Sequence, residues 1–420
     1  MAGEKQHERY DVVVIGAGPA GLTAALYAGR ARLRTLVIEK ALVGGLATYT
    51  NTICNYPGFP EDITGLELMR RFEAQARRFG VELKNSPVKR VELSGGDKTV
   101  ETFRTVYHAR AVIIATGGKP RLLGVPGEAG FLYDKGISFC ATCDAARCTD
   151  RTVMVVGSGD AAIEEGLFLT RFARKVIVSV VHEQGRVDAH AVARDEAFAN
   201  PKMEFRWNTV VDRFEGGDLL EAAVLRDTRT GEKHRVAIDR CFYFIGYVPA
   251  TELFAGQVAL TERGYVVADA RMQTSLDGVF AAGDARDTAL RQVATAVGDG
   301  AVAGFEAGRY LADLDVFERQ LMQREKPGLI YVHSAVDERS RDLLPMIHEI
   351  ERRYGGRVKL SLVDVYKGER LAARLGARSV PSVVFTRDGV VTGRCDDLSR
   401  SALVAALDEL VTGAAGEVAC

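Results

Sequence analysis

Apolar residues in the first part of the chain gather into short runs that alternate with helical stretches. Residues 10–15 form a run rich in valine and isoleucine, which is typical of a strand buried in a parallel sheet. A glycine-rich turn follows at 16–21, then a helical stretch at 22–30 and a second apolar strand at 34–38. This order of elements predicts an α/β fold built on a parallel sheet.

The glycine turn at 16–21 has the spacing of a dinucleotide-binding turn. Gly16 allows the tight turn, Gly18 lets a pyrophosphate approach the backbone, and Gly21 lets the helix pack closely on the strand. Glu39 ends the second strand, where a carboxylate can hold the hydroxyl pair of a ribose. The residues of this region predicted to bind a cofactor are Gly16, Gly18, Pro19, Ala20, Gly21 and Glu39.

Two later segments are predicted to belong to the same site. Residues 111–118 are an apolar strand that ends in a glycine pair, which suits the close approach of a cofactor. Residues 278–284 are a second such strand that ends in Gly-Asp, and its carboxylate suits the hydroxyl groups of a flavin. The contacts predicted from these segments are Ala115, Thr116, Gly117, Gly283 and Asp284.

A second glycine turn repeats the pattern further along the chain. Gly157 and Gly159 follow an apolar strand at 152–156, and a helix and a further strand are predicted at 164–172 and 175–181. Both glycines are predicted to bind a nucleotide. The chain therefore carries two nucleotide-binding units, the second inserted between pieces of the first.

The residues after the strand at 175–181 are expected to choose the nucleotide. An acid at this place accepts a free ribose 2′-hydroxyl, whereas an arginine cluster accepts a 2′-phosphate. Glu183 is the acid predicted to contact the ribose, and Arg186 is the lone arginine. The alternative is that both are solvated surface charges.

Cys140 and Cys143 stand three residues apart, a spacing that lets two thiols close a small, reducible disulfide ring. Asp144 follows them, and its carboxylate can give or take a proton as the pair opens. The alternative is a pair of structural cysteines or half of a zinc site. A zinc site needs a second pair or histidines at ligand spacing, and the chain has no second Cys-x-x-Cys, so no metal is predicted.

Composition limits the classes of partner. The chain has 420 residues, enough for about three domains, with 55 basic and 56 acidic side chains. This balance argues against nucleic acid or a membrane surface as partner. The polar N-terminus has no apolar signal-peptide core, and the odd count of seven cysteines is unlike a secreted disulfide scaffold. A cytoplasmic protein is predicted.

These motifs together resemble the low-molecular-weight, bacterial-type thioredoxin reductases over roughly residues 8–313. The most specific piece is Cys-Ala-Thr-Cys-Asp at 140–144, placed inside a nucleotide-binding unit. The other matching pieces are 16–21, Gly44-Gly45, 55–58, 157–162, Ile245-Gly246 with Pro249 and Thr251, Gly283-Asp284 and 291–293.

The resemblance implies FAD in the first unit, a reduced pyridine nucleotide in the second, and a homodimer whose nucleotide domains rotate between two reactions. It implies that Cys143 faces the flavin, that Cys140 attacks the partner disulfide and that Asp144 donates a proton. It adds flavin contacts at Gly45, Thr48, Asn55, Arg291, Gln292 and Val293.

The chain departs from the family at the second site. NADPH-dependent members carry His-Arg-Arg and a further arginine where this chain has Val180, Val181, His182 and Arg186. Classical use of NADPH is therefore not expected. The candidate donors are NADH, NADPH held without those arginines, or a donor that needs no nicotinamide site, such as ferredoxin or a second flavin. Loss of the arginines is also typical of dithiol oxidases that pass electrons to O₂.

The order of elements after residue 328 resembles thioredoxin, with Val380-Pro381 at the place of its cis-proline. Residues 337–340, Asp-Glu-Arg-Ser, stand where the thioredoxin Cys-x-x-Cys belongs, so dithiol exchange at the usual site is excluded. A docking role, a dimer-stabilising role or a substrate cleft fits this domain better. Cys395 and Cys420 restore redox function only if a mobile tail reaches Cys140.

The expected fold class is thus α/β, with two Rossmann-like three-layer domains and a C-terminal thioredoxin-like domain. The expected boundaries are 1–118 and 248–315 for FAD, 119–247 for the nucleotide domain with the cysteine pair, 316–327 for a linker and 328–420 for the last domain.

The leading functional hypothesis is an FAD-dependent reductase that passes electrons through Cys140 and Cys143 to a thioredoxin-like protein or a small disulfide. The others are a flavin dithiol oxidase using O₂, a reductase linked to ferredoxin or a second flavin, and a redox-sensing module without enzymatic activity.

Overall fold

The computed structural model describes residues 5–49, 53, 55–377, 379–412 and 418–419. Residue contacts divide the chain into two compact units, 1–307 and 308–420, and each unit is described by itself. Among the described residues, no helix is long and apolar enough to cross a membrane.

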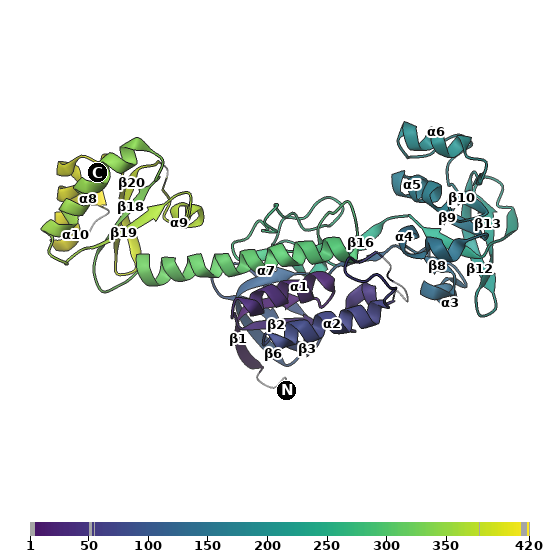
Figure 1. Cartoon of the computed structure of the whole chain (residues 1–420), viewed down its shortest axis with the longest axis horizontal. Coiled ribbons are helices and arrows are strands. Elements are labelled where there is room, and N and C mark those ends of the chain that lie inside the picture. Colours follow the sequence, from purple (N-terminus) through teal and green to yellow (C-terminus); the bar gives the residue numbers. More distant parts are fainter. Residues whose placement is uncertain (1–4, 50–52, 54, 378, 413–417, 420) are drawn as a thin grey trace. The chain divides into compact units, whose positions relative to one another are not determined.

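The first unit begins with a seven-stranded sheet of order β3-β2-β1-β6-β5-β4, in which β17 also pairs with β6. The pairs at the centre of this sheet are parallel, and they join β2 to the second halves of β1 and β6, which are largely apolar and buried on both faces. Helices α1 (Pro19–Arg30) and α2 (Gly65–Arg78) lie against this sheet (Figure 1). The strands are β1 (Gln6–Ile15), β2 (Thr35–Glu39), β3 (Glu82–Asn85), β4 (Arg90–Glu92), β5 (Lys98–Glu101), β6 (Thr105–Ile114) and β17 (Val279–Ala281).

A second sheet, of order β11-β10-β9-β15-β8, is formed by residues inserted between β6 and β17. Its described pairs are all parallel, and α5 (Asp160–Leu169) and α6 (Ala191–Ala199) pack on its core. An antiparallel sheet of β12 (Thr209–Gly216), β13 (Leu220–Asp227) and β14 (Lys233–Ala237) follows. The parallel strands are β8 (Ile137–Ser138), β9 (Thr152–Val156), β10 (Lys175–Ser179), β11 (Met203–Arg206) and β15 (Arg240–Tyr243).

Two short antiparallel strands join the two sheets. The chain leaves the first sheet through β7 (Gly118–Pro120) and returns through β16 (Tyr247–Pro249), with Gly118 paired to Pro249. The chain thus passes from one sheet to the other beside residues 118 and 247, which are the first two domain boundaries expected from the sequence.

Helix α7 (Val293–Val316) runs past the division between the units at 307 and 308. A further helical turn at Phe317–Leu321 follows it directly. The first part of the segment expected as a linker, 316–327, is therefore helical.

The second unit is a five-stranded sheet of order β19-β18-β20-β21-β22. Strand β18 (Gly328–His333) pairs in parallel with β19 (Lys359–Asp364) and antiparallel with β20 (Ser382–Arg387). Alternate residues of β18 and β20 enter two separate cores, one shared with α8 (Glu338–Arg353) and α10 (Arg400–Thr412), the other with α9 (Glu369–Arg374). These helices therefore cover opposite faces of the sheet, whose remaining strands are β21 (Val390–Cys395) and β22 (Val418–Ala419).

Two local features of this unit match the sequence. The Val380-Pro381 peptide bond is cis, as expected. Asp337 caps α8 by accepting a hydrogen bond from the Ser340 N–H at 2.7 Å, so the segment expected to replace a redox pair forms a helix cap.

Candidate functional site

A cavity of about 460 Å³ lies in the first unit, between the first glycine turn and the cysteine pair. Segments distant in the sequence line it, as the parallel topology requires when strand ends meet at one sheet edge. The predicted residues on its wall are Gly16, Gly18, Pro19, Ala20, Glu39, Gly45, Asn55, Ala115, Thr116, Gly117, Cys140, Cys143, Asp144, Gly283, Asp284, Arg291, Gln292 and Val293.

The first glycine turn has room for a pyrophosphate at one position only. Gly16 has φ +105°, and a Cβ there would lie 2.3 Å from the Ala115 carbonyl oxygen. A Cβ on Gly21 would lie 1.9 Å from the Gly16 carbonyl oxygen, whereas a Cβ on Gly18 would meet nothing within 4 Å. Gly16 and Gly21 thus allow tight packing, and Gly18 leaves the backbone N–H groups at the start of α1 accessible.

Glu39 is fixed at the edge of the cavity by backbone donors. Its Oε2 accepts from the Ala17 N–H at 2.8 Å, and its Oε1 accepts from the N–H of Lys40, also at 2.8 Å. The carboxylate at the end of β2 is therefore oriented beside the glycine turn, where a ribose is expected.

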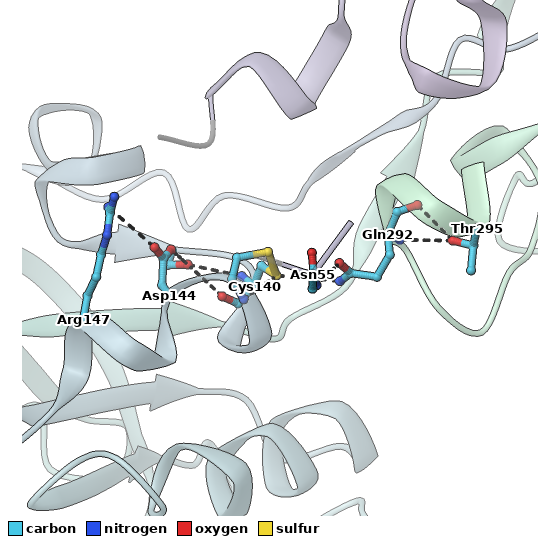
Figure 2. The surroundings of a disulfide bond; sticks show 8 residues. Asn55, Cys140, Asp144, Arg147, Gln292 and Thr295 are labelled. Atoms are coloured by element: carbon cyan, nitrogen blue, oxygen red, sulfur yellow. Dashed lines mark hydrogen bonds and ion pairs between the residues drawn. A yellow bond between two sulfur atoms is a disulfide. The ribbon is translucent and has the colours of Figure 1, made fainter. Parts of the chain in front are cut away.

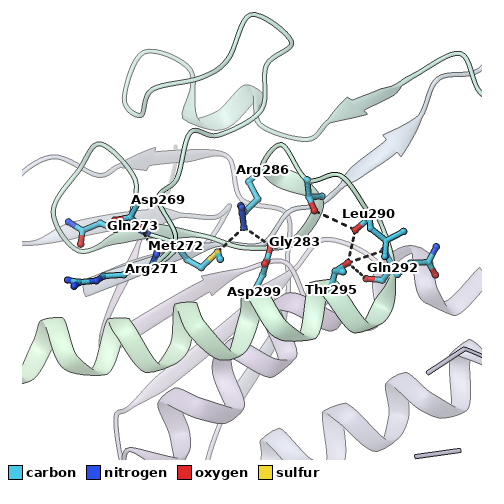
Figure 3. Close-up of polar contacts among 11 residues, drawn as sticks. Asp269, Arg271, Met272, Gln273, Gly283, Arg286, Leu290, Gln292, Thr295 and Asp299 are labelled. Atoms are coloured by element: carbon cyan, nitrogen blue, oxygen red, sulfur yellow. Dashed lines mark hydrogen bonds and ion pairs between the residues drawn. The ribbon is translucent and has the colours of Figure 1, made fainter. Parts of the chain in front are cut away.

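The turn at Gly283 and Asp284 is held from helix α7. Asp299 Oδ2 accepts from the Gly283 N–H and from Arg286 Nη1, each at 3.1 Å, and Arg286 also donates to Met272 Sδ (Figure 3). Asp284 lies in the cavity wall, where burial raises the pKa of its carboxyl to about 6 and the opposing charge of Arg291 acts in the other direction.

Arg291 lies between two tyrosines, its guanidinium carbon 5.2 Å from the Tyr247 ring centre and 5.4 Å from the Tyr265 ring centre. It donates to the Tyr265 hydroxyl at 3.1 Å, yet its buried Nε finds no hydrogen-bond partner within the described ranges. A buried, incompletely satisfied cation in a cavity with an open glycine turn fits an anionic dinucleotide such as FAD.

Cys140 and Cys143 form a disulfide at the cavity wall. Gln292 donates through Nε2 to Cys140 Sγ at 3.8 Å and accepts from Asn55 Nδ2 at 3.1 Å (Figure 2). Thr295 fixes the loop behind Gln292 by donating to the Leu290 carbonyl oxygen at 2.7 Å. The redox pair therefore contacts the loop that was predicted to close over the flavin.

Two of the other described cysteines, Cys148 and Cys241, are free thiols. Cys148 is fully buried, and burial raises the pKa of its thiol to about 12. Burial likewise raises the pKa of the Cys241 thiol. Cys395 is buried in β21 and is disulfide-bonded, and Cys54 and Cys420 lie outside the described residues.

The second glycine turn keeps its geometry, because Gly157 has φ +135° and a Cβ on Gly159 would meet nothing within 4 Å. A different acid from the predicted one faces this turn. Asp188 Oδ2 accepts from Ser158 Oγ at 2.7 Å and lies 2.8 Å from His182 Nε2. These two partners, the hydroxyl first, lower the pKa of Asp188.

Five predicted residues do not line the cavity. Gly21 packs α1 on the sheet, and Thr48 donates to the Gly45 carbonyl oxygen at 2.7 Å. Gly157 and Gly159 form the second turn, and Glu183 points to solvent with Arg186 at 3.4 Å.

Sequence reasoning missed several residues of the cavity. Ser138, Asp134 and Tyr247 line it, although none belongs to a glycine motif. Ser138 stands two residues before the cysteine pair, and Tyr247 follows Ile245-Gly246, so their neighbours were the available signals.

Comparison with known proteins agrees with this architecture. Residues 10–300 match the family described as pyridine nucleotide-disulphide oxidoreductase. The chain is 46% identical over 307 residues to the thioredoxin reductase of Mycolicibacterium smegmatis, which covers 73% of this chain and 98% of that protein. It is 43% identical over 308 residues to that of Peptoclostridium acidaminophilum, covering 72% and 97%.

A solved structure gives the same picture. Thioredoxin reductase from Streptococcus pyogenes, 41% identical, matches with a TM-score of 0.67 over 72% of this chain and 98% of that one. The chain belongs to the pyridine nucleotide-disulphide oxidoreductases and, within them, to the low-molecular-weight thioredoxin reductase family. It is an enzyme, a flavoprotein disulfide reductase. The family match ends before the second unit.

Proposed function

We propose that this protein is an FAD-dependent reductase that passes electrons through the Cys140–Cys143 disulfide to a thioredoxin-like protein or another small disulfide. The observation that carries the proposal is that this disulfide lines the same cavity as the first glycine turn. A reducible ring beside a dinucleotide site is what electron transfer between the two requires.

FAD, when bound, supplies the two-electron redox couple. Gly18 and the start of α1 would hold its pyrophosphate, Glu39 its ribose, and Arg291 and Asp284 the groups nearest the tyrosines. The binding residues therefore come from both chain segments that form the first sheet.

The cysteine pair performs the exchange. Reduction of the Cys140–Cys143 disulfide takes two electrons and two protons and yields two thiols. The Cys140 thiolate then attacks a substrate disulfide, and Cys143 attacks the Cys140 sulfur of the resulting mixed disulfide. Two substrate thiols leave, the protein disulfide is restored, and Asp144 protonates a leaving thiolate.

The proposed electron donor is NADH rather than NADPH. Asp188 accepts a hydrogen bond from Ser158, the second residue of its glycine turn. Glu39 accepts one from Ala17, the second residue of the first turn, so the two acids occupy equivalent places. A carboxylate at this place binds ribose hydroxyls and repels a 2′-phosphate. Glu183 stays a proposed ribose contact, with Asp188 as the closer acid.

A second candidate is a reductase fed by ferredoxin or a second flavin, or a dithiol oxidase using O₂. The observation that favours it is the acidity of the second turn. Asp160 lies at the start of α5, where phosphates would bind, and accepts from the His190 N–H at 2.7 Å. A carboxylate at that place opposes an anionic phosphate.

The C-terminal unit is proposed to be a thioredoxin-like domain without its own redox pair. Its sheet order, its helices on both faces and the cis Val380-Pro381 bond support this assignment. We propose that it docks a partner or stabilises a homodimer.

The test is anaerobic bleaching of the flavin absorbance by NADH, NADPH or reduced ferredoxin, each added alone. Rapid bleaching by NADH supports the proposed donor, and preferential bleaching by NADPH overturns it. Bleaching by ferredoxin alone, or peroxide formation in air with a dithiol and no nicotinamide, selects the second candidate. Cys143→Ser keeps donor-dependent bleaching but lowers disulfide turnover by roughly 1,000-fold or more.

A further inference from the structure

The carboxylate of Asp144 is held on both of its oxygens. Ser138 Oγ donates to Oδ2 at 2.6 Å, and Arg147 Nη1 lies 3.7 Å from Oδ1 (Figure 2). Ser138 ends strand β8, whereas Arg147 belongs to the helical turn Ala145–Cys148 that follows the cysteine pair. The two partners therefore fix the carboxylate from two different elements.

Arg147 is itself anchored. Its Nη1 donates to Asp134 Oδ1 at 2.7 Å, and all three charged side chains of this cluster are about one-third exposed or less, at 30% for Arg147, 34% for Asp134 and 21% for Asp144. Because a guanidinium is planar and its donors are fixed in direction, the Asp134 contact also sets how Arg147 faces Asp144.

The cluster reaches the redox pair through Ser138. The Cys140 N–H donates to Ser138 Oγ at 3.2 Å, and the same hydroxyl donates to Asp144. An unbroken chain of contacts thus runs from Asp134 through Arg147, Asp144 and Ser138 to the backbone of Cys140.

We propose that Arg147 is the residue that positions Asp144 for proton transfer during disulfide exchange. This inference rests on the proposed function, in which Asp144 is the proton donor. The Cys140 thiol first gives its proton to the Asp144 carboxylate. When the resulting thiolate forms a bond to one sulfur of the substrate, the substrate S–S bond breaks. Its electron pair stays on the leaving thiolate, which takes the carboxyl proton of Asp144 and departs as a thiol. Arg147 keeps that carboxyl group directed towards the leaving sulfur.

The other charged groups of this neighbourhood act on Cys148. Its Sγ donates to the Asp144 carbonyl oxygen at 3.4 Å, and the charges of Arg240, Asp144, Arg151 and Asp239 reach its buried thiol. Arg151 pairs with Asp239 at 3.3 Å, and no described contact links it to the Asp144 carboxylate. It is therefore a matched control for Arg147.

The experiment compares two disulfide substrates that differ in their need for a proton. The holoenzyme, reduced with dithiothreitol and desalted under nitrogen, is mixed with 5,5′-dithiobis(2-nitrobenzoate) or with hydroxyethyl disulfide. The aromatic thiolate leaves unprotonated, whereas the alkyl thiolate is a poor leaving group and needs the acid. Arg147→Gln should slow exchange with the alkyl disulfide roughly tenfold and with the aromatic one less than about twofold. Arg147→Lys should recover part of the loss, and Arg151→Gln should match the wild type.

Equal slowing with both disulfides, or a pH profile for the alkyl disulfide unchanged by Arg147→Gln, overturns the proposal. If Arg147→Gln folds poorly, Asp134→Asn tests the same chain, with an expected loss of about threefold for the alkyl disulfide alone. A wild-type reduced pair that reacts with neither disulfide contradicts the proposed function instead, so the two failures are distinguishable.

Discussion

The two glycine turns of the first unit share a backbone shape but differ in what surrounds it. In each, the first glycine has a positive φ, and the next one leaves open space on its exposed side. At the third position Gly21 admits no Cβ, whereas Ala162 carries one and is still fully buried. The first turn opens into the cavity that the cysteine pair also lines, whereas beside the second turn Asp188 is held by the side chain of Ser158. Turn geometry alone therefore does not define the ligand.

The acids beside the two turns, Glu39 and Asp188, also differ in how they are held. Glu39 is oriented by backbone N–H groups, which every residue except proline supplies, while Asp188 depends on the hydroxyl of Ser158 and the ring of His182. A site built on side-chain partners changes its ligand preference with a single substitution more easily than one built on the backbone.

The largest expected effect comes from adding one methyl group to each turn. Gly16→Ala places a Cβ 2.3 Å from the Ala115 carbonyl oxygen at φ +105°, so it should lower the free energy of unfolding by roughly 1–3 kcal/mol and release bound flavin. Gly159→Ala meets nothing within 4 Å at φ −80° and should change stability by less than about 0.5 kcal/mol. Urea unfolding and the ratio of flavin to protein absorbance measure both. Equal losses would show that the turns do not differ.

The next effect concerns the acid of the second turn. Asp188→Arg removes a carboxylate and adds a cation, so it should lower the KM for NADPH roughly tenfold and raise that for NADH. Steady-state kinetics with both nucleotides measure the change. Asp195→Arg, at an exposed residue of α6 paired with Arg194, is the control. An unchanged preference in Asp188→Arg would mean that this carboxylate does not face the nucleotide.

The third effect is on the pH dependence of stability near the first turn. Burial raises the pKa of Asp284 from 3.8 to about 6, so the folded flavin-free protein holds a proton that the unfolded chain releases at lower pH. The stability contributed by this group is present below about pH 4, falls as the pH rises through 6 and stays low above it.

Asp284→Asn removes this dependence. The variant should be more stable than the wild type by about 2 kcal/mol at pH 8, and the gain should shrink towards pH 5. Urea unfolding of the flavin-free protein at these pH values measures it. A gain that is the same at both pH values would contradict the buried-carboxyl explanation.

The sequence predicted what depends on backbone shape. The strands around the first turn, the cis bond before Pro381 and the disulfide between Cys140 and Cys143 are present in the structure. Glycine spacing and apolar runs carry this information because they constrain the chain locally.

The sequence did not reveal what depends on long-range side-chain contacts. Arg147 meets Asp134 across thirteen positions, and Asp188 reaches Ser158 across thirty. No local pattern marks such partners, and the acid chosen from spacing, Glu183, points to solvent instead.

Burial of the Cys148 thiol prevents it from exchanging with the Cys140–Cys143 disulfide. It lies five residues after Cys143, so as a thiolate it would compete for the pair and scramble the disulfide. Burial raises its pKa to about 12, which leaves it protonated at neutral pH and chemically silent. The fold thus carries a further thiol beside its redox pair and keeps it unreactive chiefly through burial.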